Sequence, residues 1–240
     1  MKIILPMAGN GQRFIDAGYL SPKPLIDVQG KPMFVRVLEN IKYGTDVHVI
    51  VQREHVKKYD IDLLIKGACP GVTIHILEEP NEGAACTVLE AIDQESDEGF
   101  LVANCDQLMS WDKSSFFEQD EVLGAGTIFT FIPDHDKPIH SYVKVDRDGF
   151  ITELAEKKMI SNIATVGVYY FPNQKDFVEA AQKMFDADDR TNGEYYLAPV
   201  YNYLSCKIKE YRVDKFIGMG TPEELDSLKQ SEWWDRINHL

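Results

Sequence analysis

The chain has 240 residues, 44% of them hydrophobic and 27% charged, so it can bury a sizeable core without disulfide or metal staples. Its formal net charge of −14 excludes attraction to nucleic acid or to an anionic membrane by the overall field, so bound phosphate would need a local cluster of cations and a metal ion. The four cysteines form no C-x-x-C pair, and no apolar run approaches the ~20 residues of a membrane span, so we expect a reduced, cytoplasmic protein.

In the first half of the chain, strand-like and helical patterns alternate. Short apolar runs predict buried strands at residues 3–7, 47–52, 72–77 and 99–104. Helical patterns lie between these runs, at residues 31–41, around 54–66 and at 83–92. This order predicts an α/β fold with a mostly parallel, Rossmann-like mixed sheet and helices on both faces.

The second half is richer in strands. Strand-like runs cover residues 124–132, 141–146, 150–157, 164–171, 207–213 and 216–220. Helical stretches lie around 174–186 and 195–204, and a last helix is expected at 221–230, with Thr221 as its N-cap. Because no repeat or linker separates the halves, we expect one domain over residues 1–240, in which residues 124–240 extend the sheet of residues 1–123.

A glycine-rich loop, LPMAGNGQRF (residues 5–14), follows the first predicted strand. It is not a dinucleotide fingerprint, because Phe14 stands at the third glycine position and the next residues look too polar and turn-like to open a helix at once. Nor does a Gly-Lys-Ser/Thr follow, as in a P-loop. Backbone N–H groups at Gly9 and Gly11, the Arg13 guanidinium and the Lys23 ammonium between two prolines would suit phosphate oxygens. The alternative is a plain turn with basic residues at the surface.

Ordered motifs along the chain extend this pattern. They are PMAGNGQRF (6–14), SPKPL (21–25), GKPM (30–33), EEPNEGAA (78–85), NCDQL (104–108), AEKK (155–158), ATVGVYYF (164–171), NGEYY (192–196) and GMGTPEEL (218–225). Over residues 2 to about 228 the chain resembles the sugar-phosphate nucleotidyltransferases, whose fold is of the nucleotide-diphospho-sugar transferase type. The resemblance implies transfer of a nucleoside monophosphate from a nucleoside triphosphate to a sugar-1-phosphate or similar phosphorylated acceptor, with release of pyrophosphate, in polysaccharide or glycoconjugate synthesis.

The resemblance also implies roles for residues of the first half, the nucleotide-binding half. The triphosphate would lie over Ala8, Gly9, Asn10 and Gly11. Arg13 and Lys23 would contact its phosphates, and Asp106, at the end of a predicted strand, would hold Mg²⁺ as the cofactor. An Asx-turn or N-cap role is the alternative for Asp106.

The segment EEPNEGAA resembles the part of the family that reads the base. Gly83 would let the backbone approach the nucleoside, and Glu78 or Glu79 would accept hydrogen bonds from amino groups of the base, which favours CTP or GTP slightly. The alternative is a solvated acidic loop.

In the second half, the acceptor-binding half, Lys157 resembles the lysine that binds the acceptor's phosphate. Gly167 and Glu194 resemble positions that hold the acceptor's hydroxyl groups. An exposed lysine at a strand end is the alternative for Lys157. The expected partners are thus two small molecules, without nucleic acid or membrane; association with further copies of the chain is left open.

The motif GMGT departs from the family, since many relatives have a second metal-binding aspartate where this chain has Gly218. Either Asp106 and the substrate phosphates hold Mg²⁺ alone, which we favour from the sequence, or another carboxylate substitutes.

Two other functions stay open at this stage. A glycosyltransferase that consumes a nucleotide sugar would share the acidic turn NCDQL, but it would not need the cationic glycine loop. A regulatory module that binds nucleotide without turnover would be compatible with the loss of the aspartate at Gly218.

Overall fold

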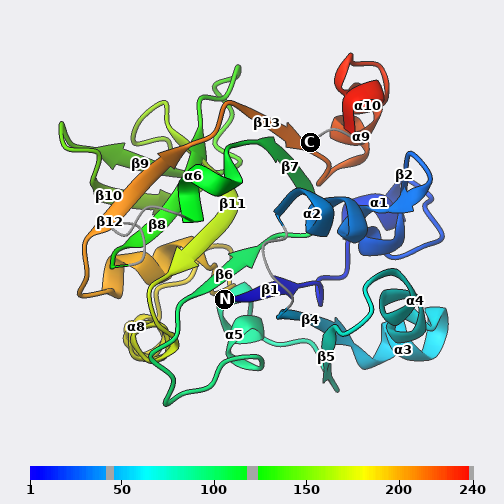
Figure 1. Cartoon of the computed structure of the whole chain (residues 1–240), viewed down its shortest axis with the longest axis horizontal. Coiled ribbons are helices and arrows are strands. Elements are labelled where there is room, and N and C mark those ends of the chain that lie inside the picture. The colour runs from blue at the N-terminus through cyan, green and yellow to red at the C-terminus, as the bar shows by residue number, and fades with distance from the viewer. Residues whose placement is uncertain (42–45, 118–123, 238–240) are drawn as a thin grey trace.

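The structure, a computed structural model, describes residues 1–41, 46–117 and 124–237; the expected boundary between the halves, at 123/124, therefore touches residues outside the described part. Within these residues, nine strands form the main sheet: β1 (Lys2–Pro6), β4 (Val47–Gln52), β5 (Thr73–Leu77), β6 (Phe100–Ala103), β8 (Gly126–Phe131), β9 (Ser141–Val145), β10 (Ile151–Glu156), β11 (Ala164–Phe171) and β12 (Ile208–Arg212). Their order is β10-β9-β11-β6-β1-β4-β5, with β8 paired to β11 and to β12 (Figure 1).

The strands that the first half contributes to the main sheet, β1, β4, β5 and β6, are parallel, as predicted. β1 lies between β4 and β6, and β4 continues to β5 at the edge. The sheet then continues into the second half through β11, which runs antiparallel to β6, β8 and β9. One mixed sheet thus connects both halves of the chain.

Alternating side chains of the strands divide the core into two layers. On β1, Ile3 and Leu5 pack into one apolar cluster and Ile4 into the other, as the period of a strand requires. The first cluster includes residues of α2 (Met33–Ile41) and α4 (Ile61–Ala68). The second includes residues of α5 (Ala84–Leu89), α8 (Gln174–Asp186) and the 3₁₀ helix η2 (Ala198–Tyr203). Helices on both faces of the sheet are therefore confirmed.

Three predicted helices differ in extent. The first begins at Met33 rather than 31, because β3 (Lys31–Pro32) pairs with β2 (Asp27–Val28). The stretch 54–66 forms two helices, α3 (Arg53–Tyr59) and α4, because Asp60 between them has a left-handed backbone with φ of 49°. The stretch 195–204 forms the 3₁₀ helix η2 rather than an α-helix.

Several elements were not predicted. They are α1 (Gln12–Asp16), η1 (Lys23–Leu25), β7 (Gln107–Ser110), α6 (Lys113–Phe117) and α10 (Trp233–Arg236). The expectation that no helix opens directly after the glycine loop was wrong, since α1 begins at Gln12 and buries Phe14. β7 pairs with β13 (Lys215–Gly218), so that Gly218 lies opposite Gln107. This pairing brings the segment that follows Gly218 next to Asp106. In Figure 1, β13 leads into α9 (Pro222–Lys229) and α10.

Helix α9 begins with the predicted N-cap. Thr221 Oγ1 accepts a hydrogen bond from the backbone N–H of Glu224 at 3.1 Å, and the Glu224 carboxylate accepts one from the N–H of Thr221, which makes a capping box.

We expect Thr221→Ala to lower the free energy of unfolding by about 1 kcal/mol, because the N–H of Glu224 loses its acceptor. Urea denaturation of the purified protein measures this loss. Thr221→Ser keeps the oxygen and is expected to retain most of the stability. Equal midpoints for wild type and Thr221→Ala would contradict the assignment.

Candidate active site

The loop after β1 is held against the sheet by backbone geometry that glycine permits. Gly11 has a left-handed backbone with φ of 65°, and a Cβ at this position would lie 3.1 Å from the Cβ of Lys23. The chain therefore turns tightly at Gly11 and passes close to η1. This approach sets Lys23 beside the glycine loop.

Lys23 forms an ion pair with Asp106, the residue predicted to hold the metal. Lys23 Nζ donates a hydrogen bond to Asp106 Oδ2 at 2.7 Å, and about a fifth of each side chain is exposed. Burial alone would lower the pKa of the Lys23 ammonium, but the adjacent carboxylate outweighs it and the pKa is raised above its ordinary value. Lys23 is therefore a permanent cation at neutral pH.

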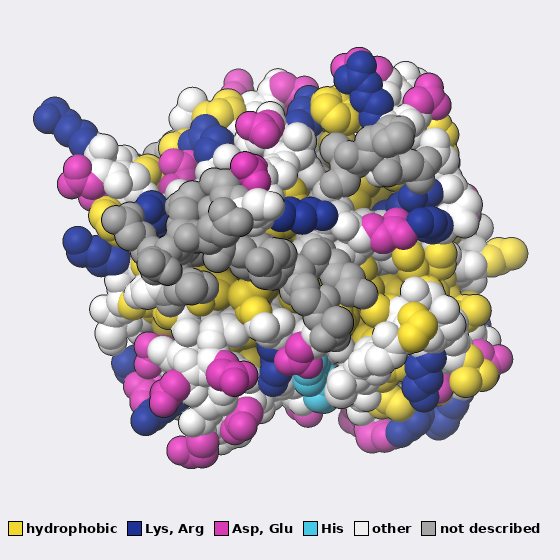
Figure 2. Space-filling model, viewed as in Figure 1, with side chains coloured by type: hydrophobic (Ala, Val, Ile, Leu, Met, Phe, Trp, Pro, Cys, Tyr) yellow, Lys and Arg dark blue, Asp and Glu magenta, His cyan; other side chains and the backbone are white. Residues whose placement is uncertain are grey.

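Arg13 adds a second positive charge to this place. Its guanidinium is exposed and close enough for its charge to act on Lys23, and among the described residues no carboxylate pairs with it. Figure 2 shows acidic and basic side chains interspersed on one face of the molecule rather than one extended basic surface. Anion binding by this acidic chain thus depends on such local cations.

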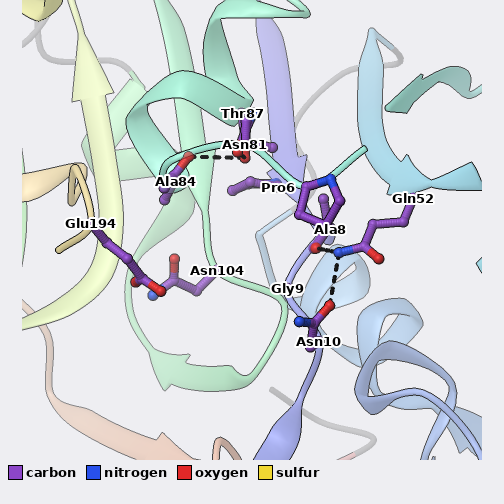
Figure 3. A pocket seen from close by; sticks show the side chains of 12 residues that line it. Pro6, Ala8, Gly9, Asn10, Gln52, Asn81, Ala84, Thr87, Asn104 and Glu194 are labelled. Carbon is purple, nitrogen blue, oxygen red and sulfur yellow. Dashed lines mark hydrogen bonds between the residues drawn. The ribbon is translucent and has the colours of Figure 1, made fainter. Parts of the chain in front are cut away.

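A cavity of about 260 Å³ lies beside the glycine loop. Its lining comes from the carboxyl ends of parallel strands and the start of α5, where ligands bind in open sheets of this kind. The lining residues are Pro6, Ala8, Gly9, Asn10, Gln52, Pro80, Asn81, Gly83, Ala84, Thr87, Asn104 and Glu194 (Figure 3). Four residues predicted for the nucleotide are thereby brought together, namely Ala8, Gly9, Asn10 and Gly83.

Gln52 and Asn104 line the cavity and were not anticipated from the sequence. Gln52 is buried, and its Nε2 donates to the carbonyl oxygen of Ala8 and, at 3.0 Å, to Asn10 Oδ1 (Figure 3). The amide of Gln52 thus links the end of β4 to the glycine loop and holds the loop in place. A glutamine that ends an apolar strand is the signal that could have pointed to this role.

Gly83 lies where two parts of the chain nearly touch. A Cβ at Gly83 would lie 2.5–2.9 Å from backbone atoms of Tyr195, and Tyr195 in turn donates its N–H to the carbonyl oxygen of Glu82 at 2.8 Å. No other residue fits there without moving the backbone. This close contact carries Glu194 to the rim of the cavity.

Two of the residues predicted for the acceptor belong to strands of the second half or follow them, since Lys157 comes directly after β10 and Gly167 lies within β11. Lys157 Nζ contacts the hydroxyl of Tyr196 and lies 4.3 Å from the centre of its ring. The neighbouring Glu156 accepts a hydrogen bond from Ser141 Oγ, and burial raises the pKa of its carboxyl group. Gly167 on β11 accepts the N–H of Asn104 at 2.9 Å. Glu194 lines the cavity with the glycine loop and points toward Asn104 (Figure 3).

Glu78 is not brought to the cavity. Its carboxylate pairs with Arg53 at 2.6 Å on the surface, and its side chain is 70% exposed. The hydrogen bond from Arg53 lowers the pKa of Glu78, so the carboxylate is charged and already paired with a guanidinium. Glu79 does not line the cavity either.

The donor atoms around Asp106 are of the kind that bind a magnesium ion. A carboxylate at a sheet edge, with a side-chain cation already resting on one of its oxygens, has the hard donor atoms that Mg²⁺ prefers. In the described part of the chain, no group of three or more His, Cys, Asp or Glu is arranged to hold a metal, so substrate phosphates and water would have to complete the coordination. The adjacent Cys105 is buried, and its thiol is a soft donor that Mg²⁺ does not prefer.

Comparison with known proteins identifies the family. The sequence matches the family described as Nucleotidyl transferase over residues 1–205. The chain belongs to the nucleotidyl transferase family. This membership does not favour the glycosyltransferase alternative or the regulatory one.

Among curated family members, the chain is 30% identical over 120 residues to an N-acetylmuramate alpha-1-phosphate uridylyltransferase of Neisseria meningitidis serogroup B, which covers 49% of this chain and 52% of that protein. It is 27% identical over 221 residues to the bifunctional protein GlmU of Methanocaldococcus jannaschii, covering 89% of this chain and 48% of that one. The chain thus spans about half the length of the curated relatives it matches.

The fold is similar to that of a solved structure, a nucleoside-diphosphate-sugar pyrophosphorylase from Vibrio cholerae RC9. The TM-score is 0.78 at 22% sequence identity, over 95% of this chain and all of that one. The predicted type of fold, that of nucleotide-diphospho-sugar transferases, is thereby confirmed. In the described residues, no helix combines the length and the apolar character that crossing a membrane requires.

Proposed function

We propose that the chain is a Mg²⁺-dependent nucleotidyltransferase that transfers a nucleoside monophosphate from a nucleoside triphosphate to a sugar phosphate, with release of pyrophosphate. The observation that carries the proposal is the Lys23–Asp106 ion pair, in which Lys23 lies against Gly11 of the glycine loop that lines the cavity with Ala8, Gly9 and Asn10. Family membership supports the reaction class, and the pair supplies the charges that this class needs.

The chemistry requires little proton transfer. An oxygen of the acceptor's phosphate, already an anion, forms a bond to the α-phosphorus, while the bond from that phosphorus to the bridging oxygen of the β-phosphate breaks. The electron pair of that bond leaves with pyrophosphate. No general base is needed, so the barrier lies in bringing two anions together and in stabilising the charge that develops.

Residues of this chain supply the compensating charge. Arg13, which has no carboxylate partner among the described residues, can bind phosphate oxygens with its planar fork of donors. Lys23 is held at its position by Asp106 and adds a point charge. Asp106 would hold Mg²⁺, which neutralises phosphate oxygens when bound. These groups act by position and charge.

The second half of the chain would bind the acceptor. Lys157 lies beside the half-buried Glu156 and the hydroxyl of Tyr196, a combination of cation and hydrogen-bonding groups that suits a phosphate on a hydroxylated molecule. Glu194 reaches the cavity itself, so we assign it to a ribose or acceptor hydroxyl at the boundary of the two ligands.

We propose no particular base, because neither glutamate that favoured CTP or GTP, Glu78 or Glu79, lines the cavity. Glu78 pairs with Arg53 and does not line the cavity, which removes the support for these two nucleotides. The acceptor is proposed only as a phosphorylated sugar or a similar polar compound.

A matrix of four nucleoside triphosphates against phosphorylated sugars, alcohols and amino compounds tests the proposal through pyrophosphate release. We expect release with one or two nucleotides and one class of acceptor, only when Mg²⁺ is present. The matching product is the nucleoside-diphosphate compound. Mass spectrometry should detect one molecule of it for each pyrophosphate released.

Other outcomes would reject the proposal. Release of a nucleoside diphosphate from a nucleotide sugar, without pyrophosphate from any triphosphate, would show a glycosyltransferase. Saturable nucleotide binding without turnover across the whole matrix would show a regulatory module.

A further inference from the structure

Two carboxylates approach the short loop from Gly218 to Thr221. On one side, Met219 donates its N–H to the carbonyl oxygen of Asp106 at 2.8 Å, and a Cβ placed on Gly220 would lie 2.8 Å from Asp106 Oδ2. On the other side, the same Cβ would lie 3.4 Å from Glu224 Oε2. Asp106 and Glu224 therefore border one small space, although 118 positions separate them in the sequence (224 less 106).

The Glu224 carboxylate also fills the space beside Gly218. A Cβ on Gly218 would lie 3.0 Å from Glu224 Cδ, and 3.1 and 3.2 Å from its two oxygens. A side chain at position 218 would therefore require the Glu224 carboxylate to move by a few tenths of an ångström. The family pattern described above has an aspartate at position 218; here a carboxylate occupies the adjoining space, but it comes from helix α9.

The hydrogen bonds of Glu224 use only one of its oxygens. Oε2 accepts the N–H of Gly220 at 2.8 Å and that of Thr221 at 3.1 Å. Among the described residues, Oε1 accepts no hydrogen bond and no Lys or Arg pairs with Glu224. The two backbone bonds thus orient the carboxylate and leave Oε1 available.

We infer that Glu224 supplies a second carboxylate oxygen to the divalent cation held by Asp106, and that Gly218 is the residue that makes room for it. The cation resting on Asp106 in this structure is the Lys23 ammonium, which marks a place where positive charge is stabilised. This inference rests on the proposed function, since it concerns the metal of the same site. It reverses the preference drawn from the sequence for Asp106 as the sole protein ligand.

A purely structural role for Glu224 makes a different prediction. Position 224 is the third residue of helix α9, where either glutamate or glutamine completes a capping box. Glu224→Gln therefore keeps the shape and the backbone hydrogen bonds but removes the charge. If Glu224 only caps the helix, this variant should bind metal as the wild type does.

Binding of Mn²⁺ alone to the purified full chain, followed by electron paramagnetic resonance of the free ion, distinguishes the two roles. We expect Glu224→Gln to weaken Mn²⁺ binding by about tenfold or more, since changing even an outer-shell group costs a metal site that much. The matched control is Glu223→Gln, which removes one charge from an exposed neighbour on the same helix and should leave Mn²⁺ binding unchanged. Thermal melting confirms that each variant is folded.

A swap of positions tests the role of Gly218. Glu224→Ala should weaken Mn²⁺ binding, and adding Gly218→Asp should restore most of the lost affinity, because the alanine vacates the space beside position 218. A folded double variant that binds no better than Glu224→Ala would contradict the assigned role of Gly218.

Two results would overturn the inference itself. These are wild-type affinity for Mn²⁺ in Glu224→Gln, and the absence of bound Mn²⁺ on the folded wild type at millimolar metal. Pyrophosphate release is measured in parallel on the same samples. A wild type that releases pyrophosphate while Glu224→Gln keeps full Mn²⁺ affinity would retain the proposed function and reject only the second ligand.

Discussion

Replacing Lys23 by alanine is expected to lower kcat by ~10²–10³-fold while the protein stays folded, as loss of one preorganised charge does in other active sites. Lys23 is held 2.7 Å from Asp106 and lies against Gly11 of the glycine loop, so its ammonium is positioned before any ligand arrives. Steady-state kinetics of pyrophosphate release, with circular dichroism for the fold, measure the effect.

Although Lys23→Ala lowers kcat, it should also lower the Mg²⁺ concentration that the enzyme needs. Because the Lys23 ammonium occupies Asp106 Oδ2, it competes with a divalent cation for that oxygen. Lys23→Ala should therefore reach half of its residual activity at a lower Mg²⁺ concentration than the wild type does. A lysine that merely stabilises the fold would not separate kcat from the metal requirement.

A surface lysine provides the control for this experiment. Lys183 is exposed on α8, away from the glycine loop, and Lys183→Ala should leave both kcat and the Mg²⁺ requirement unchanged. An unchanged kcat in Lys23→Ala would remove Lys23 from its assigned role.

The strands of this fold could be predicted from the sequence because burial alone determines them. Runs such as 47–52 and 99–104 become β4 and β6, which are covered by helices on both faces and are therefore mostly apolar. The parallel order follows from the alternation with helices. No local interaction had to be known.

The missed elements give little local signal in the sequence, for two different reasons. β7 exists because residues 107–110 pair with residues 215–218, and nothing near NCDQL announces that partner. Helix α1 is five residues long and is fixed by Phe14, which is buried and packs edge-on against Tyr19 with ring centres 5.1 Å apart. A short polar helix with one buried residue gives too weak a periodic pattern to be recognised.

The residues of the candidate site also divide into those that the sequence could predict and those that only the fold brings together. Arg13, Lys23 and Asp106 belong to short motifs that a reader of the sequence can recognise, and the structure brings Lys23 and Asp106 into contact. Gln52 and Glu224 act across the fold instead. The capping pattern from Thr221 to Glu224 was visible in the sequence, but the neighbours of the Glu224 carboxylate were not.

Replacing Asp106 should lower the reaction rate more than replacing Lys23 does. We expect Asp106→Ala to abolish the Mg²⁺-dependent rate, a loss of ~10³-fold or more, because a metal ion contributes several kcal/mol to such a reaction. Asp106→Asn keeps the size of the side chain and should lose the same rate. It removes the charge that Lys23 pairs with, so the half-buried ammonium is left without its counter-ion.

Because Asp106→Asn also breaks the ion pair with Lys23, its effect on stability must be measured separately from its effect on the reaction. Part of any change in Asp106→Asn could come from reduced stability, so its melting temperature is compared with that of the double variant Lys23→Gln with Asp106→Asn, in which no unpaired charge remains. If the metal is bound through Asp106, both variants are inactive at saturating Mg²⁺ even where the double variant melts near the wild type. Asp186→Asn, on the exposed end of α8, should retain full activity. An Asp106→Asn enzyme whose rate still rises with Mg²⁺ would show that other groups hold the metal, because an amide oxygen without charge cannot replace the carboxylate against the competing phosphates.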